Sequence, residues 1–357
     1  MKLKLFFTST LLIPVFLIAQ SYDVIGIGSP CVDMIYYNIE DSFLQTLQIQ
    51  NGDSQYAGSW ERFSSALEKT HALGYQAKMA TGGSASNTIK GLAQLEHDTA
   101  FVGKVGADPS GIFYTKMAED LNIHLPIEHA QEPATLQLAV FVTADQQRTF
   151  LTYRSSGSFL SPQNLSPSLF EKVNLVHFEG YTINECSSEF LEKAMQLAKA
   201  SGALISFDMG CMRIAKNYSE TILYFIKNYV DIVFANESEI EALLNMPFQT
   251  GSALLASYCP ISVVLLGEKG AMVSHKEKQF YSSARSVKAI DTNGAGDLFI
   301  SGFLHGYLKG HELQDCAWIG NLLGGAVVSC SGGEIPATKW PSLKQEIHEH
   351  LEAVCLK

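Results

Sequence analysis

Short apolar runs alternate with helical patterns along the second half of the chain, and this alternation limits the fold more than any other feature. The apolar runs are residues 175–178, 203–207, 232–234 and 262–266. The helical patterns that separate them lie near residues 186–200, 214–228 and 237–245. Because parallel strands need long crossovers, this order is typical of βαβ units. We therefore predict an α/β fold with a doubly wound, mostly parallel sheet covered by helices on both faces.

Polar residues lie at the ends of these apolar runs. The carboxyl ends of parallel strands meet at one edge of a sheet, where ligands bind. Asp208, Asn236 and Gly267 follow predicted strands, and His177 lies within one. A lone histidine in an apolar run is more often packed than catalytic, so we expect the other three to be the better candidates.

The turn Asp291-Thr-Asn-Gly-Ala-Gly-Asp297 opens an apolar helical run. Small residues let backbone N–H groups converge, and a helix N-terminus adds a positive end, so Gly294, Ala295 and Gly296 predict an anion site. The neighbouring acid, Asp297, can accept a proton from a hydroxyl. A phosphate cradle beside a base suits a small-molecule kinase, whereas the alternative is an ordinary helix N-cap.

A second glycine turn, Thr81-Gly-Gly-Ser-Ala-Ser-Asn87, also leads into a helical pattern. Gly82 and Gly83 allow a ligand to approach the backbone closely, and Asn87 offers donors and an acceptor to hydroxyl groups. The alternative is a tight turn without a ligand. Asp33 is an acid inside an apolar stretch, where it can bind substrate hydroxyls or cap a turn.

Two further segments suggest contacts with a nucleotide. Asn236 and Glu239 are three residues apart and share one helix face, where they can order the water shell of Mg²⁺. The competing interpretation is a helix N-cap with acids that favour the helix dipole. Gly267 and Gly270 belong to a strand-to-hairpin turn that can line a nucleotide base or ribose.

A hairpin interrupts the α/β pattern in the first half of the chain. Residues 137–143 and 149–153 alternate in polarity around a polar turn, and Arg148 lies at its mouth. A hairpin in this position predicts a lid over the sheet. Arg148 can then reach a phosphate, although an ordinary exposed arginine is the alternative.

Composition and missing motifs exclude several classes of protein. The 357 residues, 46% of them hydrophobic, suit one large domain or two. A formal net charge of -11 argues against a general nucleic-acid binder. The seven cysteines include no CxxC pair, which argues against zinc or a disulfide framework. Cys31 stands where a dinucleotide fingerprint needs its third glycine, and no Walker sequence is present.

Residues 1–21 form a hydrophobic leader with a short basic start, which resembles a secretory signal peptide. The apolar part is too short for a stable membrane span and contains Pro14. A non-native extension is the alternative. We expect a cytoplasmic protein, because ATP chemistry and unpaired cysteines suit the cytosol; an exported protein is the alternative if the leader is a true signal.

These motifs together resemble the PfkB, or ribokinase-like, family of carbohydrate kinases. The GG-x-x-x-N turn is Gly82–Asn87, the N-x-x-E element is Asn236–Glu239, and D-T-x-G-A-G-D is Asp291–Asp297. The resemblance covers residues 22–357. It implies an ATP-dependent kinase with a ribokinase-like fold and a small β lid, for which we expect segments near 33–58 and 135–157.

The resemblance also implies roles for individual residues. Asp297 is expected to be the catalytic base, and the amides of Gly294, Ala295 and Gly296 the anion hole. The remaining implied roles are substrate contacts at Asp33, Gly82, Gly83, Asn87 and Arg148, ATP or Mg²⁺ contacts at Asn236, Glu239, Gly267 and Gly270, and a monovalent-cation site, usually for K⁺, near Asp291.

Within the family the chain is most similar to the adenosine kinase branch, on residues 82–93 and 148–157. This similarity implies transfer of the γ-phosphoryl group of ATP to a primary hydroxyl of a nucleoside or sugar, with adenosine favoured. Residues 28–33 depart from the branch pattern. A ribokinase- or fructokinase-like sugar kinase, or a non-catalytic ligand-binding protein, is the alternative. We expect a small-molecule substrate, no nucleic-acid partner, and a monomer or homodimer.

Overall fold

The computed structural model describes residues 21–126, 130–131, 135–145, 147–155 and 159–355. The predicted leader lies outside the described residues except for Ser21. Three residues of the second predicted lid segment, at positions 146, 156 and 157, lie outside them as well.

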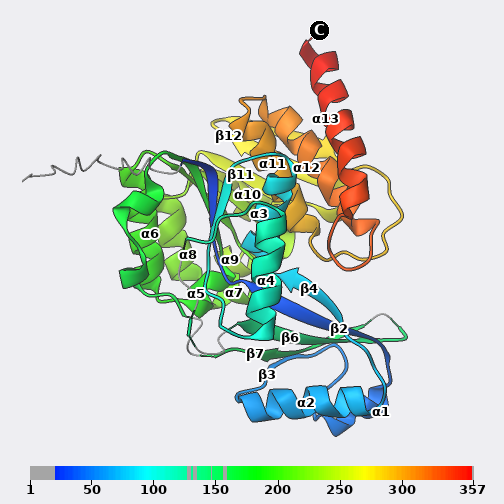
Figure 1. The fold of residues 1–357 in the computed structure, drawn as a ribbon. Helices are drawn as coiled ribbons and strands as arrows, with labels where there is room; N and C mark the ends of the chain where they lie inside the picture. The colour runs from blue at the N-terminus through cyan, green and yellow to red at the C-terminus, as the bar shows by residue number, and fades with distance from the viewer. Residues whose placement is uncertain (1–20, 127–129, 132–134, 146, 156–158, 356–357) are drawn as a thin grey trace, which may run out of the picture.

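An eight-stranded sheet forms the larger part of the molecule (Figure 1). Its spatial order is β13-β12-β11-β10-β9-β8-β1-β5, and only the pairs β11–β12 and β12–β13 are antiparallel. The strands are β1 (Tyr22–Ile27), β5 (Thr99–Val102), β8 (Val173–Glu179), β9 (Leu204–Asp208), β10 (Ile232–Asn236), β11 (Ile261–Leu265), β12 (Gly270–His275) and β13 (Lys278–Ser283). The predicted mostly parallel sheet is confirmed.

Helices cover both faces of this sheet, because its strands are apolar on both sides. In β1, Ile25 and Ile27 pack into one core with α6, α8, α9 and α10, whereas Val24 packs into the opposite core with α3, α4, α11 and α12. The α-helices of this part are α3 (Ser84–Gln94), α4 (Pro109–Asp120), α5 (Tyr181–Glu185), α6 (Ser188–Ala200), α7 (Met212–Asn217), α8 (Ser219–Asn228), α9 (Glu237–Leu244), α10 (Phe248–Ala256), α11 (Ala295–Leu308), α12 (Leu313–Val328) and α13 (Trp340–Cys355). Short 3-10 helices are η2 (Pro162–Asn164), η3 (Pro167–Phe170), η4 (Gly267–Lys269) and η5 (Ala337–Lys339).

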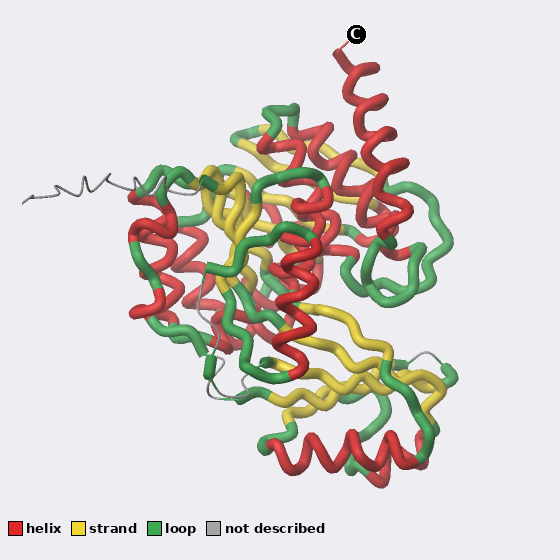
Figure 2. The backbone as a smooth tube through the Cα atoms, in the orientation of Figure 1, coloured by secondary structure: helices red, strands yellow, loops and turns green. Residues whose placement is uncertain are grey.

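A second, five-stranded sheet lies below the first in Figure 2, with two helices on its outer face. Its order is β3-β7-β6-β2-β4, and β6 and β7 form the predicted hairpin. The elements are β2 (Cys31–Ile39), α1 (Asp41–Thr46), β3 (Ser54–Tyr56), α2 (Trp60–Ala72), β4 (Lys78–Gly82), β6 (Leu136–Thr143) and β7 (Arg148–Tyr153). The segments expected to form a lid, near 33–58 and 135–157, thus supply four of its strands.

One buried acid joins the two sheets. Glu179, at the end of β8, accepts hydrogen bonds from the backbone N–H of Ser29 at 3.0 Å and of Ala85 at 2.6 Å. Ser29 lies between β1 and β2, and Ala85 follows β4 at the start of α3. The backbone is therefore fixed at one point where it leaves β1 for β2 and where it leaves β4 for α3.

The sequence patterns missed β3 and β4 and merged α7 with α8. Residues 78 and 79 of β4 are exposed and β3 has only three residues, so neither shows an apolar alternation. The predicted helix near 214–228 is interrupted at Tyr218. Such breaks are decided by packing and leave little trace in a single apolar pattern.

Glycines allow α11 and α12 to pack with their backbones close together. A Cβ on Gly302 would lie 2.7 Å from the carbonyl oxygen of Ile319, and one on Gly320 would lie 2.9 Å from that of Phe299. Both distances are shorter than a carbon–oxygen contact permits. The side-by-side packing of these helices thus requires residues without side chains.

We predict that Gly302→Ala lowers the free energy of unfolding by about 1–3 kcal/mol, because the added methyl group forces α11 and α12 apart. Urea unfolding measures this change. Gly325→Ala, also in α12, is the matched control, since the nearest atom to its Cβ would be 3.8 Å away. The control should be neutral or stabilising by about 0.5–1 kcal/mol, and equal losses in both variants would contradict the packing argument.

Candidate active site

A cavity of about 410 Å³ lies between the two sheets at the carboxyl ends of β9 and β10. Asp33 and Arg148 line it from the second sheet, and Asp208 and Asn236 line it from the larger one. The N-termini of α3 and α11 complete its wall. The position agrees with the expectation that ligands of such sheets bind beyond the strand ends.

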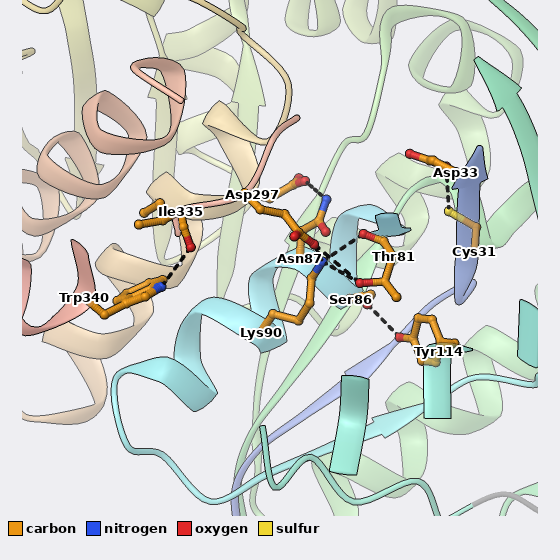
Figure 3. A network of polar contacts seen from close by, with 11 residues as sticks. Cys31, Asp33, Thr81, Ser86, Asn87, Lys90, Tyr114, Asp297, Ile335 and Trp340 are labelled. Carbon is orange, nitrogen blue, oxygen red and sulfur yellow. Dashed lines mark hydrogen bonds and ion pairs between the residues drawn. The ribbon is translucent and has the colours of Figure 1, made fainter. Parts of the chain in front are cut away.

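Asp297 lies in the first turn of α11 and faces α3. Its side-chain oxygens accept hydrogen bonds from Ser84 Oγ and from Asn87 Nδ2, each at 2.8 Å, and Figure 3 shows the Asn87 contact. Burial raises the pKa of the Asp297 carboxyl, while the bonds from Asn87 and Ser84 and the charge of Lys90 oppose the rise. The carboxylate is therefore oriented but accessible to a proton from the cavity.

The glycine turn before Asp297 has the backbone that an anion site needs. Gly294 has φ 72°, in the left-handed region, and a Cβ there would lie 2.6 Å from the carbonyl oxygen of Gly333. Ala295 and Gly296 open α11 and line the cavity. First-turn N–H groups have no acceptor within their helix, so they can bind negative charge.

Ser84 bridges two carboxyl groups in this cavity. Its Oγ lies 2.8 Å from Asp297 Oδ1 and 3.0 Å from Asp208 Oδ2. A hydroxyl has one proton and can donate it to only one carboxylate. The second contact is a hydrogen bond only if that carboxyl is protonated, so the geometry favours a proton shared within the cluster.

The energetics of Asp208 agree with this geometry. Burial raises the pKa of Asp208 well above its usual range, and repulsion from Glu239 and Asp297 raises it further. Burial also raises the pKa of Glu239. Asp208, Glu239 and Asp297 thus lie close together at the cavity wall, and ionising all three is unfavourable until a cation approaches.

Asn236 and Glu239 form a reciprocal helix cap at the start of α9. The Asn236 N–H donates to Glu239 Oε2 at 2.8 Å, and the Glu239 N–H donates to Asn236 Oδ1 at 2.9 Å. The N-cap interpretation is therefore correct. Both residues also line the cavity, so the cap holds a carboxylate and an amide at its wall.

The donor set can be tested for Mg²⁺. Within the described part of the chain, no three His, Cys, Asp or Glu side chains are arranged to hold a metal ion by themselves. Mg²⁺ usually keeps several waters and binds through one or two carboxylates and substrate phosphates. The carboxylates of Asp208 and Glu239 line the cavity and suit this binding of Mg²⁺ through its water molecules.

Asp33 faces the cavity from β2, beside the glycine turn of Gly82 and Gly83, and is labelled in Figure 3. Burial raises the pKa of its carboxyl to about 6, although Lys90 lowers it. A Cβ on Gly82 would lie 2.7 Å from Cys31 Sγ, and Gly83 has φ 101° with its Cβ position 2.3 Å from the carbonyl oxygen of Ser29. The turn can therefore be made only by glycines.

Arg148 and Asp291 form an ion pair across the cavity wall. Arg148 begins β7 in the second sheet, and Asp291 opens the turn that leads to α11. The carboxylate that the family resemblance associates with a monovalent cation thus already faces a guanidinium. A guanidinium has five N–H donors, so Arg148 retains donors for a ligand.

A second cavity of about 750 Å³ adjoins the first and shares Leu265, Ala295 and Gly296 with it. Its wall includes the predicted nucleotide contacts Gly267 and Gly270. Apolar side chains contribute much of the rest, namely Val287, Ala289, Phe299 and Val328. An apolar cavity that continues past the glycine turn suits a planar base whose phosphates reach toward Asp297.

Several residues of the first cavity carry no functional signal in the sequence. Ser84 is a first-turn serine, and this position is so common for helix starts that it carries no special signal. Tyr181 and Glu334 also line the cavity, although no motif in the sequence includes them. Their proximity arises from segments far apart in the sequence.

Comparison with known proteins shows the family of this chain. The pattern of the pfkB family carbohydrate kinases matches residues 59–340. The chain belongs to this family. A PfkB kinase is a phosphotransferase, and the ribokinase-like fold predicted from the motifs is confirmed.

The relatives of this PfkB kinase include a nucleoside kinase and a probable fructokinase. A nucleoside kinase from Methanocaldococcus jannaschii is 27% identical over 272 residues, which cover 75% of this chain and 86% of that protein. Probable fructokinase-3 from Arabidopsis thaliana is 30% identical over 283 residues, covering 72% and 79%. The crystal structure of adenosine kinase from Sinorhizobium meliloti superposes with a TM-score of 0.81 at 29% identity, covering 92% of this chain and 99% of that one.

Kinases of this fold use ATP with a divalent metal, which agrees with the acids and the glycine turn described above. Among the described helices of this PfkB kinase, none is both long and apolar enough to cross a membrane.

We predict that Asp208→Asn makes the ligand-free protein more thermostable at pH 8. The folded-state pKa of Asp208 lies above its unfolded value, so its ionisation destabilises the fold as pH rises through that interval. Asparagine carries no charge and can donate a hydrogen bond to Ser84. We expect a gain in Tm of about 2–5 °C at pH 8 and little gain at pH 4.

Differential scanning fluorimetry in EDTA measures this difference. Glu277→Gln is the control, because Glu277 is an exposed acid in the β12–β13 turn. A gain for Asp208→Asn at pH 4 that equals its gain at pH 8 would contradict the electrostatic explanation.

Proposed function

We propose that the protein is an ATP-dependent kinase that phosphorylates a primary hydroxyl of a nucleoside or sugar, with adenosine the favoured substrate. One observation carries the proposal. The carboxylate of Asp297 lies beside the anion-binding turn of Gly294–Gly296, in a cavity that Asp33 closes on the other side. A base, a cradle for phosphate and a group that holds hydroxyls therefore surround one space.

In the proposed mechanism Asp297 takes the proton from the attacking hydroxyl. Ser84 and Asn87 hold its carboxylate in place, and its raised pKa makes it a stronger base than an exposed aspartate. Asp33, Gly82, Gly83 and Asn87 bind the other hydroxyls of the substrate. The second sheet acts as a lid, and its closure excludes water that would otherwise compete for the phosphoryl group.

The N–H groups of Gly294, Ala295 and Gly296 stabilise negative charge that develops during phosphoryl transfer. ATP enters from the second cavity, where Gly267 and Gly270 line the space for its base and ribose. Asn236 and Glu239 would hold hydrated Mg²⁺ at the cavity wall. When bound, the metal neutralises phosphate charge, which also relieves the repulsion among the acids of the cavity.

Adenosine is favoured because a nucleoside kinase and an adenosine kinase are among the relatives at 27% and 29% identity. A sugar kinase is the second candidate. A probable fructokinase is 30% identical, and polar residues and glycines dominate the lining of the first cavity. We place the enzyme in the cytoplasm, a choice supported by its ATP chemistry and by the free thiols of Cys211, Cys259, Cys316 and Cys330.

We predict that Asp297→Asn lowers kcat by about 10²- to 10⁴-fold, because asparagine cannot accept the hydroxyl proton. Steady-state kinetics with the best substrate measures kcat, and circular dichroism checks the fold. Asp315→Asn, in the first turn of α12, replaces a comparable acid outside the cavity and should retain kcat. Near-normal turnover of folded Asp297→Asn would reject Asp297 as the base.

A panel of acceptors tests the substrate. ATP consumption should be fastest with adenosine when adenosine, inosine, ribose, fructose and fructose phosphates are compared at equal concentration. Faster turnover of a sugar would support the second candidate. Binding of these compounds without turnover of any would instead support a ligand-binding protein that retains the fold.

A further inference from the structure

Three N–H donors of this chain already hold the carboxylate of Asp291. Its Oδ2 accepts hydrogen bonds from the Arg148 guanidinium and from the Gly332 backbone N–H at 2.9 Å. Its Oδ1 accepts one from the Asn293 N–H at 3.1 Å. The Asp291 side chain is only 9% exposed, so few of its acceptor positions face solvent.

This environment does not fit a monovalent cation at Asp291. Such a cation needs oxygen ligands, whereas each donor around this carboxylate presents a hydrogen. A bound cation would also lie close to the positive Arg148, and like charges repel strongly where water is largely excluded. The Arg148 side chain is itself only 20% exposed.

We infer that the Arg148 guanidinium takes the place of a monovalent cation at Asp291, so that this kinase works without potassium. The inference rests on the proposed function. Arg148 is a positioning residue here, because it acts on the anion-binding turn through Asp291.

The contacts around Asp291 show how the ion pair reaches the turn. Asp291 holds the Asn293 N–H, and Asn293 directly precedes Gly294. Asp291 also holds Gly332, whose neighbour Gly333 packs its carbonyl oxygen against Gly294. By holding the Asp291 carboxylate in place, the positive Arg148 therefore fixes the segments of Asn293 and Gly332, which shape the anion-binding turn.

Arg148 carries this positive charge on the second sheet. The anion-binding turn is thus completed when that sheet lies over the cavity, as it does in this structure. A free cation would complete the turn whether or not the sheet was in place. Arg148 instead makes completion of the turn depend on the position of the second sheet. Phosphoryl transfer is therefore limited to the closed arrangement.

Potassium-free kinetics test the inference on the full chain. The enzyme is assayed with the sodium-free, potassium-free Tris salt of ATP and MgCl₂, with either KCl or choline chloride at about 0.1 M so that ionic strength is equal. The kcat of the wild-type protein should agree within about twofold in the two salts, because an ion that does not bind shifts no equilibrium. A wild-type kcat at least about tenfold higher in KCl would overturn the inference.

Arg148→Met removes the charge and keeps an unbranched side chain. In choline chloride its kcat should fall by roughly 10- to 100-fold, and KCl should restore at least part of this loss because Asp291 then lacks a cation. Arg148→Lys should remain independent of KCl. Arg62→Met is the matched control, since Arg62 bonds to Tyr56 and Gln55 on the exposed side of the second sheet. If folded Arg148→Met loses kcat and KCl does not restore it, the inference that Arg148 takes the place of a cation is overturned.

A measurement without turnover separates this inference from the proposed function. KCl should raise the Tm of Arg148→Met above its value in choline chloride by about 2 °C, but it should not raise the Tm of the wild-type protein. A rise in the wild type alone would overturn the inference even if no substrate were found. Absence of turnover in every salt, with the predicted Tm pattern, would reject the proposed function and leave the inference supported.

Discussion

The site depends on one contact, in which two helix N-termini meet at the carboxylate of Asp297. Ser84 and Asn87 in α3 donate hydrogen bonds to this carboxylate in α11. A buried carboxylate without such donors would be strongly destabilising, so the helices must approach closely. Small residues make the approach possible, since a Cβ on Gly91 of α3 would lie 2.3 Å from Ser301 Oγ of α11. The packing of the core and the chemistry of the site therefore both require α3 and α11 to lie close together.

The second sheet is held to this centre at three places. Glu179 binds the backbone where the chain passes from β1 to β2 and from β4 to α3. Lys90 of α3 donates to the carbonyl oxygen of Thr81 in β4 at 2.9 Å and pairs with Glu334, and Arg148 pairs with Asp291. Glu334 belongs to the loop after α12, and Asp291 accepts a hydrogen bond from Gly332 of the same loop, which also packs against the glycine turn. Movement of the second sheet therefore changes the geometry of the anion-binding turn, where phosphate charge would be stabilised.

The neighbouring acids Asp208, Glu239 and Asp297 show that the site is not optimised for the stability of the empty protein. Burial and mutual repulsion raise the pKa of Asp208, and burial raises those of Glu239 and Asp297. Each raised pKa means that ionisation costs folding free energy at neutral pH. Proteins often retain such conflicts at functional sites, where a ligand resolves them. In the proposed function a hydrated cation and ATP would do so.

The sequence by itself determined the kind of fold and the turns of the site. Apolar runs of strand length between helical patterns predicted the parallel sheet, and two glycine turns before helices predicted the wall near Asp297. These features depend on neighbours along the chain, so they leave local patterns. The tertiary structure alone decided the bridge from Ser84 to Asp208, the pairing of Arg148 with Asp291, and the short strands β3 and β4. Those contacts join residues more than a hundred positions apart, or strands whose exposed residues lack alternation, and neither leaves a periodic signal in the sequence.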